Sequence, residues 1–303
     1  MARAIKLARK GLYSTHPNPR VGCVLVKDGQ IVGEGFHQVA GEGHAEVLAL
    51  RDAGSKAANA TAYVTLEPCS HHGKTPPCAD ALVSSGVARV VIAADDPNPL
   101  VSGQGIERLK AAGIQVDTGL MQQEAIELNP GFHKRMESGL PWGRVKLAMS
   151  LDGRTAMASG ESQWITGEQA RRDVQLLRAR SEAILTGAGT VRADNPSLNV
   201  RLSSKELGIE QNVIQPLRVV VDSELKTPAD ARMFSLEGAT LLVCGREGLE
   251  QEQKLTKAGA ELVCCPGEGG RVDLEAMLKE LASREVNEVH VEAGEHLCGA
   301  LLE

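Results

Sequence analysis

The apolar residues in the first part of the chain recur with two different periods, which predicts strands separated by helices. Two apolar runs meet at Asp28-Gly29, a pair typical of the tight turn in a β-hairpin. Other β-branched runs predict single strands, and apolar residues spaced three and four positions apart predict helices. We expect this hairpin at 21–36, strands at 60–67, 87–96 and 114–119, and helices at 1–12, 44–54, 78–86 and 105–113.

A stretch rich in proline and glycine interrupts this pattern at 128–143. We place a domain boundary there, which gives domains at 1–141 and 142–303. The second domain begins with a predicted hairpin at 144–158. We expect further strands at 182–187, 217–222, 239–244, 261–265 and 287–292, and helices at 166–180 and 273–284. Strands that alternate with helices indicate layered α/β sheets.

The composition restricts the classes of protein that the chain can represent. Its 303 residues carry a formal net charge of −6, which weighs against a nucleic-acid partner, because surfaces that bind nucleic acids are normally basic. The sequence contains no run of 18 apolar residues, and its first residues are too charged for a secretory signal. We therefore expect a cytoplasmic protein, in which a disulfide between Cys69 and Cys78 is not expected.

The segment Leu66–Cys78, LEPCSHHGKTPPC, combines two cysteines with three prolines, so it is predicted to be a fixed loop. Upstream, His44 and Glu46 form an H-x-E pattern at the start of a predicted helix. Zinc binds imidazole and thiolate ligands, and a catalytic zinc site keeps one position open. His44, Cys69 and Cys78 are therefore the predicted ligands. Glu46, beside the open position, is the predicted general acid–base residue.

This arrangement matches the zinc deaminase signature H-x-E…P-C-x-x-C, except that eight residues rather than two separate the cysteines. Several alternatives remain open at this point. Cys69 and Cys78 could be buried apolar residues, or His71 or His72 could close a purely structural zinc site. The alternative functions are a nucleic-acid base deaminase, such as a tRNA-editing enzyme, and a non-catalytic, metal-stabilised binding protein.

The segments THPNPRVGCVLV, GEGHAEVLAL, TAYVTLEPCSHHGKTPPC and DPNP together resemble the bifunctional deaminase-reductase family of riboflavin biosynthesis. The second half resembles the same family in KLAMSLDGRTA, SGESQWIT, AILTGAGTVRADNPSLNVR and VEAG. The long spacing between the cysteines is that family's form of the loop. The resemblance implies a cytidine-deaminase-like α/β/α layered domain followed by a dihydrofolate-reductase-like α/β domain.

The resemblance further implies two consecutive reactions on a small-molecule pyrimidine ribose phosphate. The first domain, with one zinc ion per chain, would hydrolyse an amine from 2,5-diamino-6-(ribosylamino)-4(3H)-pyrimidinone 5′-phosphate. The second would reduce the ribosyl group of the resulting aminouracil to ribityl with NADPH. We also expect a homo-oligomer and neither a nucleic-acid nor a membrane partner.

Matching positions in the family imply further site residues. Contacts to the deaminase substrate are expected at Asn18, Lys74, Thr75, Asp96 and Asn98. Contacts to NADPH are expected at Ala148, Trp164, Thr190, Asp194, Ser223 and Gly294. Contacts to the reductase substrate are expected at Ser162, Arg178, Leu198, Arg201 and Glu292. The two arginines suit a ribose phosphate, because guanidinium groups bind phosphate through paired hydrogen bonds.

Two features depart from the family pattern. Glu295-His296 stands where the family usually has Pro-Thr, and a negative Glu295 that pointed inward would disfavour the NADPH phosphates. The family also continues beyond the position of Glu303 with strands that complete the reductase sheet. We therefore expect C-terminal strands to be missing and the reduction to be weak.

Overall fold

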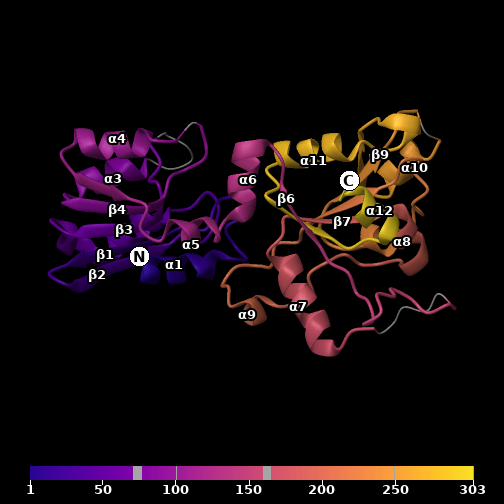
Figure 1. The fold of residues 1–303 in the computed structure, drawn as a ribbon, viewed down its shortest axis with the longest axis horizontal. Coiled ribbons are helices and arrows are strands. Elements are labelled where there is room, and N and C mark those ends of the chain that lie inside the picture. Colours follow the sequence, from indigo (N-terminus) through magenta and orange to yellow (C-terminus); the bar gives the residue numbers. More distant parts are fainter. Residues whose placement is uncertain (71–76, 100, 160–164, 249, 303) are drawn as a thin grey trace. The chain divides into compact units, whose positions relative to one another are not determined.

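The computed structural model describes residues 1–70, 77–99, 101–159, 165–248 and 250–302. The chain divides into two compact units, which Figure 1 shows in the colours of the sequence. The first unit comprises Met1–Ser138 with Gly208–Gln211, and the second comprises Gly139–Leu207 with Asn212–Glu303. Each unit contains one β-sheet and its own hydrophobic core.

The first unit is built on a five-stranded mixed sheet with the order β2-β1-β3-β4-β5. Its central strand β3 pairs antiparallel with β1 and parallel with β4. The predicted hairpin is confirmed: β1 and β2 pair antiparallel, and both turn residues, Asp28 and Gly29, have positive φ angles. The strands are β1 (Gly22–Lys27), β2 (Gln30–Phe36), β3 (Thr61–Leu66), β4 (Arg89–Ala94) and β5 (Gln115–Thr118).

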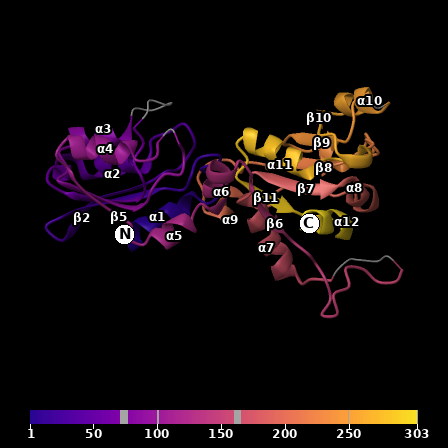
Figure 2. The ribbon, with the colours of Figure 1, turned by 45° about the horizontal axis from the view of Figure 1, so that its top comes forward.

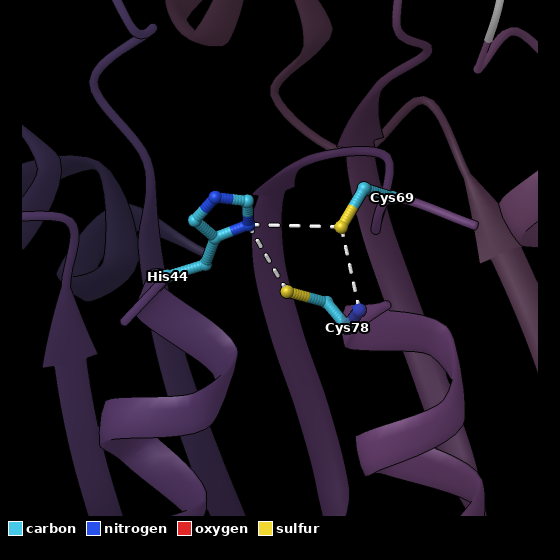
Figure 3. A group of neighbouring side chains, drawn as sticks. All are labelled: His44, Cys69 and Cys78. Carbon is cyan, nitrogen blue, oxygen red and sulfur yellow. Dashed lines mark hydrogen bonds between the residues drawn. The ribbon is translucent and has the colours of Figure 1, made fainter. Parts of the chain in front are cut away.

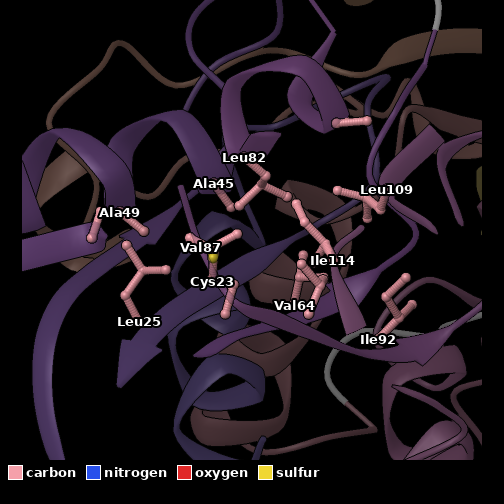
Figure 4. Close-up of a cluster of buried hydrophobic side chains, with 14 of the residues drawn as sticks. Cys23, Leu25, Ala45, Ala49, Val64, Leu82, Val87, Ile92, Leu109 and Ile114 are labelled. Carbon is pink, nitrogen blue, oxygen red and sulfur yellow. The ribbon is translucent and has the colours of Figure 1, made fainter. Parts of the chain in front are cut away.

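Helices cover both faces of this sheet, as Figures 1 and 2 show. Alternate residues of β1 face opposite sides: Cys23 and Leu25 pack with helices α2, α3 and α4, whereas Val24 packs with α1. Figure 4 shows the larger of these two clusters, which consists of aliphatic side chains and Cys23. The helices are α1 (Ala2–Ala8), α2 (Ala45–Ala53), α3 (Cys78–Ser84), α4 (Gln104–Ala111), α5 (Gln122–Ile126) and α6 (Pro130–Ser138), with short 3-10 turns at Arg9–Gly11 and Gly54–Ala57.

Helix α6 corrects the prediction of an irregular break at 128–143. Pro130 is the first residue of this helix, a position where a missing backbone N–H has no consequence. The preceding Asn129 is buried, and its side chain pairs with the backbone of Arg20 through bonds of 2.7 and 3.0 Å. Because this contact joins residues 109 positions apart, no local sequence pattern predicts it.

The second unit is built on a six-stranded sheet with the order β10-β9-β8-β7-β11-β6. All neighbouring strands in it run parallel, which places their carboxyl ends at one edge. The five strands predicted for the later part of this unit are confirmed. The strands are β6 (Trp142–Val145), β7 (Ala183–Gly187), β8 (Leu217–Val221), β9 (Thr240–Cys244), β10 (Ala260–Cys264) and β11 (Glu288–Val291).

The predicted hairpin at 144–158 is only partly present. The turn at Asp152-Gly153 forms, because the backbone of Ser150 bonds to both Gly153 and Arg154. Only Trp142–Val145 is a strand in this region, however, and its partner is the distant β11. This strand therefore belongs to the parallel sheet and does not form the local hairpin that the sequence pattern indicated.

Helices also cover both faces of the second sheet, and Figures 1 and 2 show α11 and α7 on opposite sides of it. Val219, Leu241 and Val243 pack with α11, whereas Val220 and Leu242 pack with α8 and α10. Among the described residues, no helix has both the length and the apolar content that a membrane span needs. The helices are α7 (Glu168–Ala179), α8 (Ala188–Asp194), α9 (Ser204–Leu207), α10 (Glu252–Lys257), α11 (Leu274–Ser283) and α12 (Glu295–Ala300), with short 3-10 turns at Arg232–Ser235 and Glu268–Gly270.

Candidate active sites

Three separate segments of the first unit bring His44, Cys69 and Cys78 together (Figure 3). His44 is the N-cap residue of α2, and Cys78 is the first residue of α3. Cys69 lies on the loop that follows β3. The cysteine loop is tied to α3 twice, because the Cys69 carbonyl accepts the N–H of Ala79 at 3.1 Å and the Cys69 sulfur accepts the N–H of Cys78 at 3.3 Å.

The three side chains have the spacing of a metal site. The Nδ1 atom of His44 lies 3.2 Å from the Cys78 sulfur and 3.6 Å from the Cys69 sulfur, and all three donor atoms lie within 4.8 Å of one another. Zinc bonds of about 2.0–2.3 Å at tetrahedral angles separate two ligands by about 3.6 Å, so this donor set fits zinc. Both cysteines are free thiols, which excludes the disulfide. His71 and His72 lie outside the described residues.

The electrostatics of the cluster favour a cation. Hydrogen bonds from Cys78 and His44 lower the pKa of the Cys69 thiol to about 4, against the opposing effect of burial. The interaction with the Cys69 side chain and then burial raise the pKa of the Cys78 thiol, and repulsion by the charges of Glu46 and Cys69 adds to the effect. The hydrogen bond with Cys69 also raises the pKa of His44. A bound cation would relieve this repulsion and hold both sulfurs as thiolates.

Glu46 occupies the first turn of α2 and is only 3% exposed. Burial is the main reason that its pKa is raised, to about 7, and the Cys69 charge adds to the effect. The Cys78 side chain lies close enough to oppose part of this pKa shift, so the Glu46 carboxyl group lies beside the cluster. A carboxyl group whose pKa is close to neutral is suited to both accepting and releasing a proton.

His37, which the sequence reasoning missed, connects Asn18 to the backbone just before His44. Its Nδ1 lies 3.2 Å from the carbonyl oxygen of Gly43, and its Nε2 lies 3.0 Å from the side-chain nitrogen of Asn18. Nδ1 must carry the proton to donate to a carbonyl, so Nε2 accepts from the Asn18 amide. The ring also contacts His44 edge to face at 5.2 Å. A single histidine after a strand belongs to no motif, so the sequence contained no signal for it.

Of the other expected contacts to the deaminase substrate, the structure describes Asp96 and Asn98. Asp96 is buried, and this burial, with the charges of Glu67 and Cys69, raises its pKa to about 6. Its carboxylate accepts the backbone N–H of Asn98 at 2.8 Å, so the two residues form one turn. Lys74 and Thr75 lie outside the described residues.

The NADPH positions expected in the second unit gather at one edge of its sheet. Ala148 lies beyond the carboxyl end of β6, Thr190 and Asp194 lie on α8 directly after β7, and Ser223 and Gly294 follow β8 and β11. These four strands are consecutive neighbours, in the order β8-β7-β11-β6. Parallel α/β sheets bind ligands at this edge. Trp164 lies outside the described residues.

The substrate positions expected in the second unit form a second polar cluster. Arg178 on α7 forms a bidentate ion pair with Glu292, which follows β11, at 2.5 and 2.9 Å. Arg178 also donates to the carbonyl oxygen of Asn199 at 2.9 Å, beside the buried Leu198. Burial opposes ionisation of Glu292, but the hydrogen bonds and charge of Arg178 prevail and lower its pKa. Ser162 lies outside the described residues.

Arg201, an exposed residue, completes this cluster. Partial burial and then the charge of Arg178 lower its pKa, while Glu292 opposes the shift, so the three charges lie near one another. The Arg201 backbone N–H donates to the side chain of Gln175 on α7 at 2.9 Å. Two arginines and one glutamate give this cluster a net positive charge, which is favourable for an anionic group.

Family models match both halves of the chain. Residues 1–94 match the cytidine and deoxycytidylate deaminase zinc-binding region, which includes all three predicted zinc ligands. Residues 141–303 match the RibD C-terminal domain.

Curated proteins and solved structures resemble the chain along nearly its whole length. The riboflavin biosynthesis protein RibD of Escherichia coli (strain K12) is 54% identical over 308 residues, which cover 100% of this chain and 83% of that protein. The structure of Acinetobacter baumannii RibD is 47% identical, with a TM-score of 0.89, over 99% of this chain and 81% of that one. A deaminase/reductase structure from Thermotoga maritima is 37% identical, with a TM-score of 0.85, over 100% and 82%.

Proposed function

The chain belongs to the RibD family of riboflavin biosynthesis, whose members are deaminase/reductase enzymes, and on that premise we propose a reaction for each unit. The first unit hydrolyses an amine from 2,5-diamino-6-(ribosylamino)-4(3H)-pyrimidinone 5′-phosphate with one zinc ion. The second unit reduces the ribosyl group of the product to ribityl with NADPH. The substrate of both units is a small pyrimidine ribose phosphate.

His44, Cys69 and Cys78 would hold the zinc in the first unit. When bound, the ion supplies a Lewis acid that makes water nucleophilic near neutral pH. Glu46 would accept the protons of the attacking water in turn and deliver one to the ring and one to the leaving amine. Its burial beside Cys78 supports this role, because a carboxylate in that place adds nothing to a purely structural zinc site.

Asn18 would contact the pyrimidine edge, and His37 would keep its amide in one orientation. The hydrogen bond from His37 Nδ1 to the Gly43 carbonyl keeps the ring proton on Nδ1. The unprotonated Nε2 can then only accept, so the nitrogen of the Asn18 amide, rather than its oxygen, faces His37. Lys74, Thr75, Asp96 and Asn98 stay predicted contacts to the remaining substrate groups.

In the second unit, Ala148, Trp164, Thr190, Asp194, Ser223 and Gly294 would line the NADPH site. Ser162, Arg178, Leu198, Arg201 and Glu292 would line the substrate site. The ion pair between Arg178 and Glu292 would form one side of the substrate site, and Arg201 would supply the cation for the ribose phosphate. NADPH supplies the hydride, so the protein's own task is to hold the sugar carbon beside the cofactor.

The observation that carries the proposal is the cluster of two thiols and an imidazole beside a buried carboxyl group with a pKa of about 7. Its test is incubation of the protein with the diaminopyrimidine substrate, with and without NADPH, and identification of the products by mass. We expect the deaminated ribosyl compound without NADPH and the ribityl compound with it. Ammonia release from RNA but not from the nucleotide would favour the base-deaminase alternative. No ammonia from either would favour the binding protein.

A further inference from the structure

Glu67 is a buried carboxylate whose partners are backbone amides of two separate segments. It follows β3, two residues before Cys69, and is only 3% exposed. Its Oε1 accepts the N–H groups of Gly105 at 2.9 Å and Ile106 at 3.2 Å. Its Oε2 accepts the N–H groups of Gly103 at 3.0 Å and Asp96 at 3.4 Å. These bonds reach the start of α4 and the loop that follows β4.

A second contact joins the same two segments independently. Gly105, in the first turn of α4, lies against the carbonyl oxygen of Pro68, the residue before Cys69. A Cβ atom on Gly105 would lie 2.0 Å from that oxygen, which is closer than any real contact. The start of α4 is therefore packed directly against the backbone that leads to the cysteine.

These contacts indicate a structural role for the Glu67 side chain, which takes no part in the proposed mechanism. Four backbone N–H groups converge on one carboxylate, and the start of a helix favours a negative charge. The carboxylate makes all four bonds as an acceptor, and a neutral amide of the same shape cannot replace it, because its nitrogen only donates.

We infer that Glu67 is a positioning residue for the deaminase site. It clamps the cysteine loop, the loop of Asp96 and the start of α4 into one arrangement, so that the Cys69 sulfur and the Asp96-Asn98 turn keep a constant separation. The inference rests on the proposed zinc site, because it assigns the clamp to the geometry of that site. Residues that support metal ligands in this way typically change metal affinity or activity 10–100-fold when they are replaced, which is about the effect expected here.

Two substitutions disturb the clamp through different atoms. Glu67→Gln replaces one acceptor oxygen with a donor that faces two backbone N–H groups. Gly105→Ala keeps Glu67 but forces the Pro68 carbonyl away from α4. The control is Gly113→Ala, which follows the other end of α4, where φ is +80° and a Cβ would meet nothing within 4 Å. It introduces backbone strain next to the same helix without touching the cysteine loop.

The cobalt-substituted protein gives a readout that a merely stabilising role would leave unchanged. We expect Glu67→Gln and Gly105→Ala to shift the visible absorption bands of bound Co²⁺ and to release Zn²⁺ to a chelator about 10–100-fold faster. Deamination should fall over a similar range, while reduction in the second unit stays at its wild-type value. In Gly113→Ala the Co²⁺ spectrum, the zinc release and the deamination should also stay at wild-type values.

The outcomes separate this inference from the proposed function. If wild-type protein binds Co²⁺ and deaminates, but both clamp variants keep the wild-type spectrum and zinc retention, the inference is wrong and the proposed function stands. If the wild-type protein binds neither metal, the zinc site itself is wrong, and the inference falls with it. If Glu67→Gln does not fold, Gly105→Ala decides: a shifted Co²⁺ spectrum supports the clamp, and an unshifted one overturns it.

Discussion

Arg178 and Glu292 form a two-bonded ion pair, 2.5 Å between Nε and Oε1 and 2.9 Å between Nη2 and Oε2, although 114 residues separate them. Both side chains are largely buried, with exposed fractions of 9% and 14%. A third N–H of Arg178 donates to Asn199. Arg178 therefore has little donor capacity left for a phosphate, and Arg201, nearby and exposed, is the better candidate.

Replacement of Arg201 should weaken binding of the phosphorylated aminouracil intermediate. Because a hydrogen bond to a charged group contributes about 1.5–3 kcal/mol, Arg201→Gln should raise the KM of the reduction roughly 10–100-fold. Steady-state oxidation of NADPH measures this change. The dephosphorylated intermediate provides the control, since its KM should not depend on Arg201. An equal rise in both KM values would contradict the phosphate assignment.

Replacement of Arg178 should act on stability as well as on reduction. Arg178→Gln leaves the carboxylate of Glu292 buried without its cation, and breaking a buried ion pair typically costs about 3–5 kcal/mol. The thermal transition of the second unit should therefore shift to lower temperature. The double variant Arg178→Gln/Glu292→Gln should recover much of the loss, and calorimetry of all three proteins tests this. No recovery in the double variant would show that the pair does not act as a unit.

Glu46→Gln should retain zinc but lose deamination. The amide cannot accept the proton of a water, and such acid–base residues contribute about 10²–10⁴-fold to the rate. Ammonia release measures the loss, and metal analysis measures the zinc. Glu42→Gln, at an exposed position four residues upstream, is the matched control and should behave as the wild type. Loss of zinc in Glu46→Gln, or normal deamination, would remove Glu46 from this role.

Cys78→Ser should remove the zinc, since a serine hydroxyl is a poor ligand where a thiolate stood. Deamination should stop, while reduction in the second unit continues. Cys264→Ser, a partly buried cysteine of β10 in the second unit, controls for cysteine replacement in general and should keep the metal. Full zinc content with intact deamination in Cys78→Ser would sink the ligand assignment.

His290 should make the second unit less stable in acid. This residue of β11 is fully buried, and burial lowers its pKa from the ordinary value of 6.5 to about 4, despite the opposing charge of Glu292. Between these pH values the unfolded chain binds a proton that the folded chain does not. Stability is therefore complete above pH 6.5 and is lost as the pH falls towards 4, by about 2 kcal/mol at pH 5.

His290→Leu should abolish this part of the pH dependence, because leucine does not titrate. Thermal unfolding at pH 5.0 and 7.5 measures this dependence. The Tm decrease between these two pH values should be smaller in His290→Leu than in the wild type by roughly 4–8 °C, which corresponds to about 2 kcal/mol. His296→Leu, at an exposed position in the same unit, is the control and should retain the wild-type dependence. The same slope in His290→Leu as in the wild type would exclude His290 as its source.

Several features of this fold could be predicted because their causes are local. The Asp28-Gly29 hairpin depends on two residues that tolerate positive φ, and both show it in the structure. Helices begin directly after His44 and at Cys78, close to where the apolar periodicity indicated. The spacing H-x-E, P-C and the second cysteine also pointed to the cluster in Figure 3, since each part of that motif lies at the start of a helix or on the loop after a strand.

The remaining relationships were decided by tertiary structure. His37 reaches Asn18 across 19 residues, and Glu67 reaches Gly105 across 38, and neither contact leaves a periodic trace in the sequence. Pro130 looked like an interruption, but it begins a helix that Asn129 anchors to Arg20. The strand Trp142–Val145 pairs with β11 rather than with its neighbour in sequence. The sequence by itself determined which residues are candidates for the chemistry, because residue type and local spacing indicate them directly. Only the fold decided which buried groups hold them in place, because such partners are chosen by distance in space and by the need to satisfy every buried donor and acceptor.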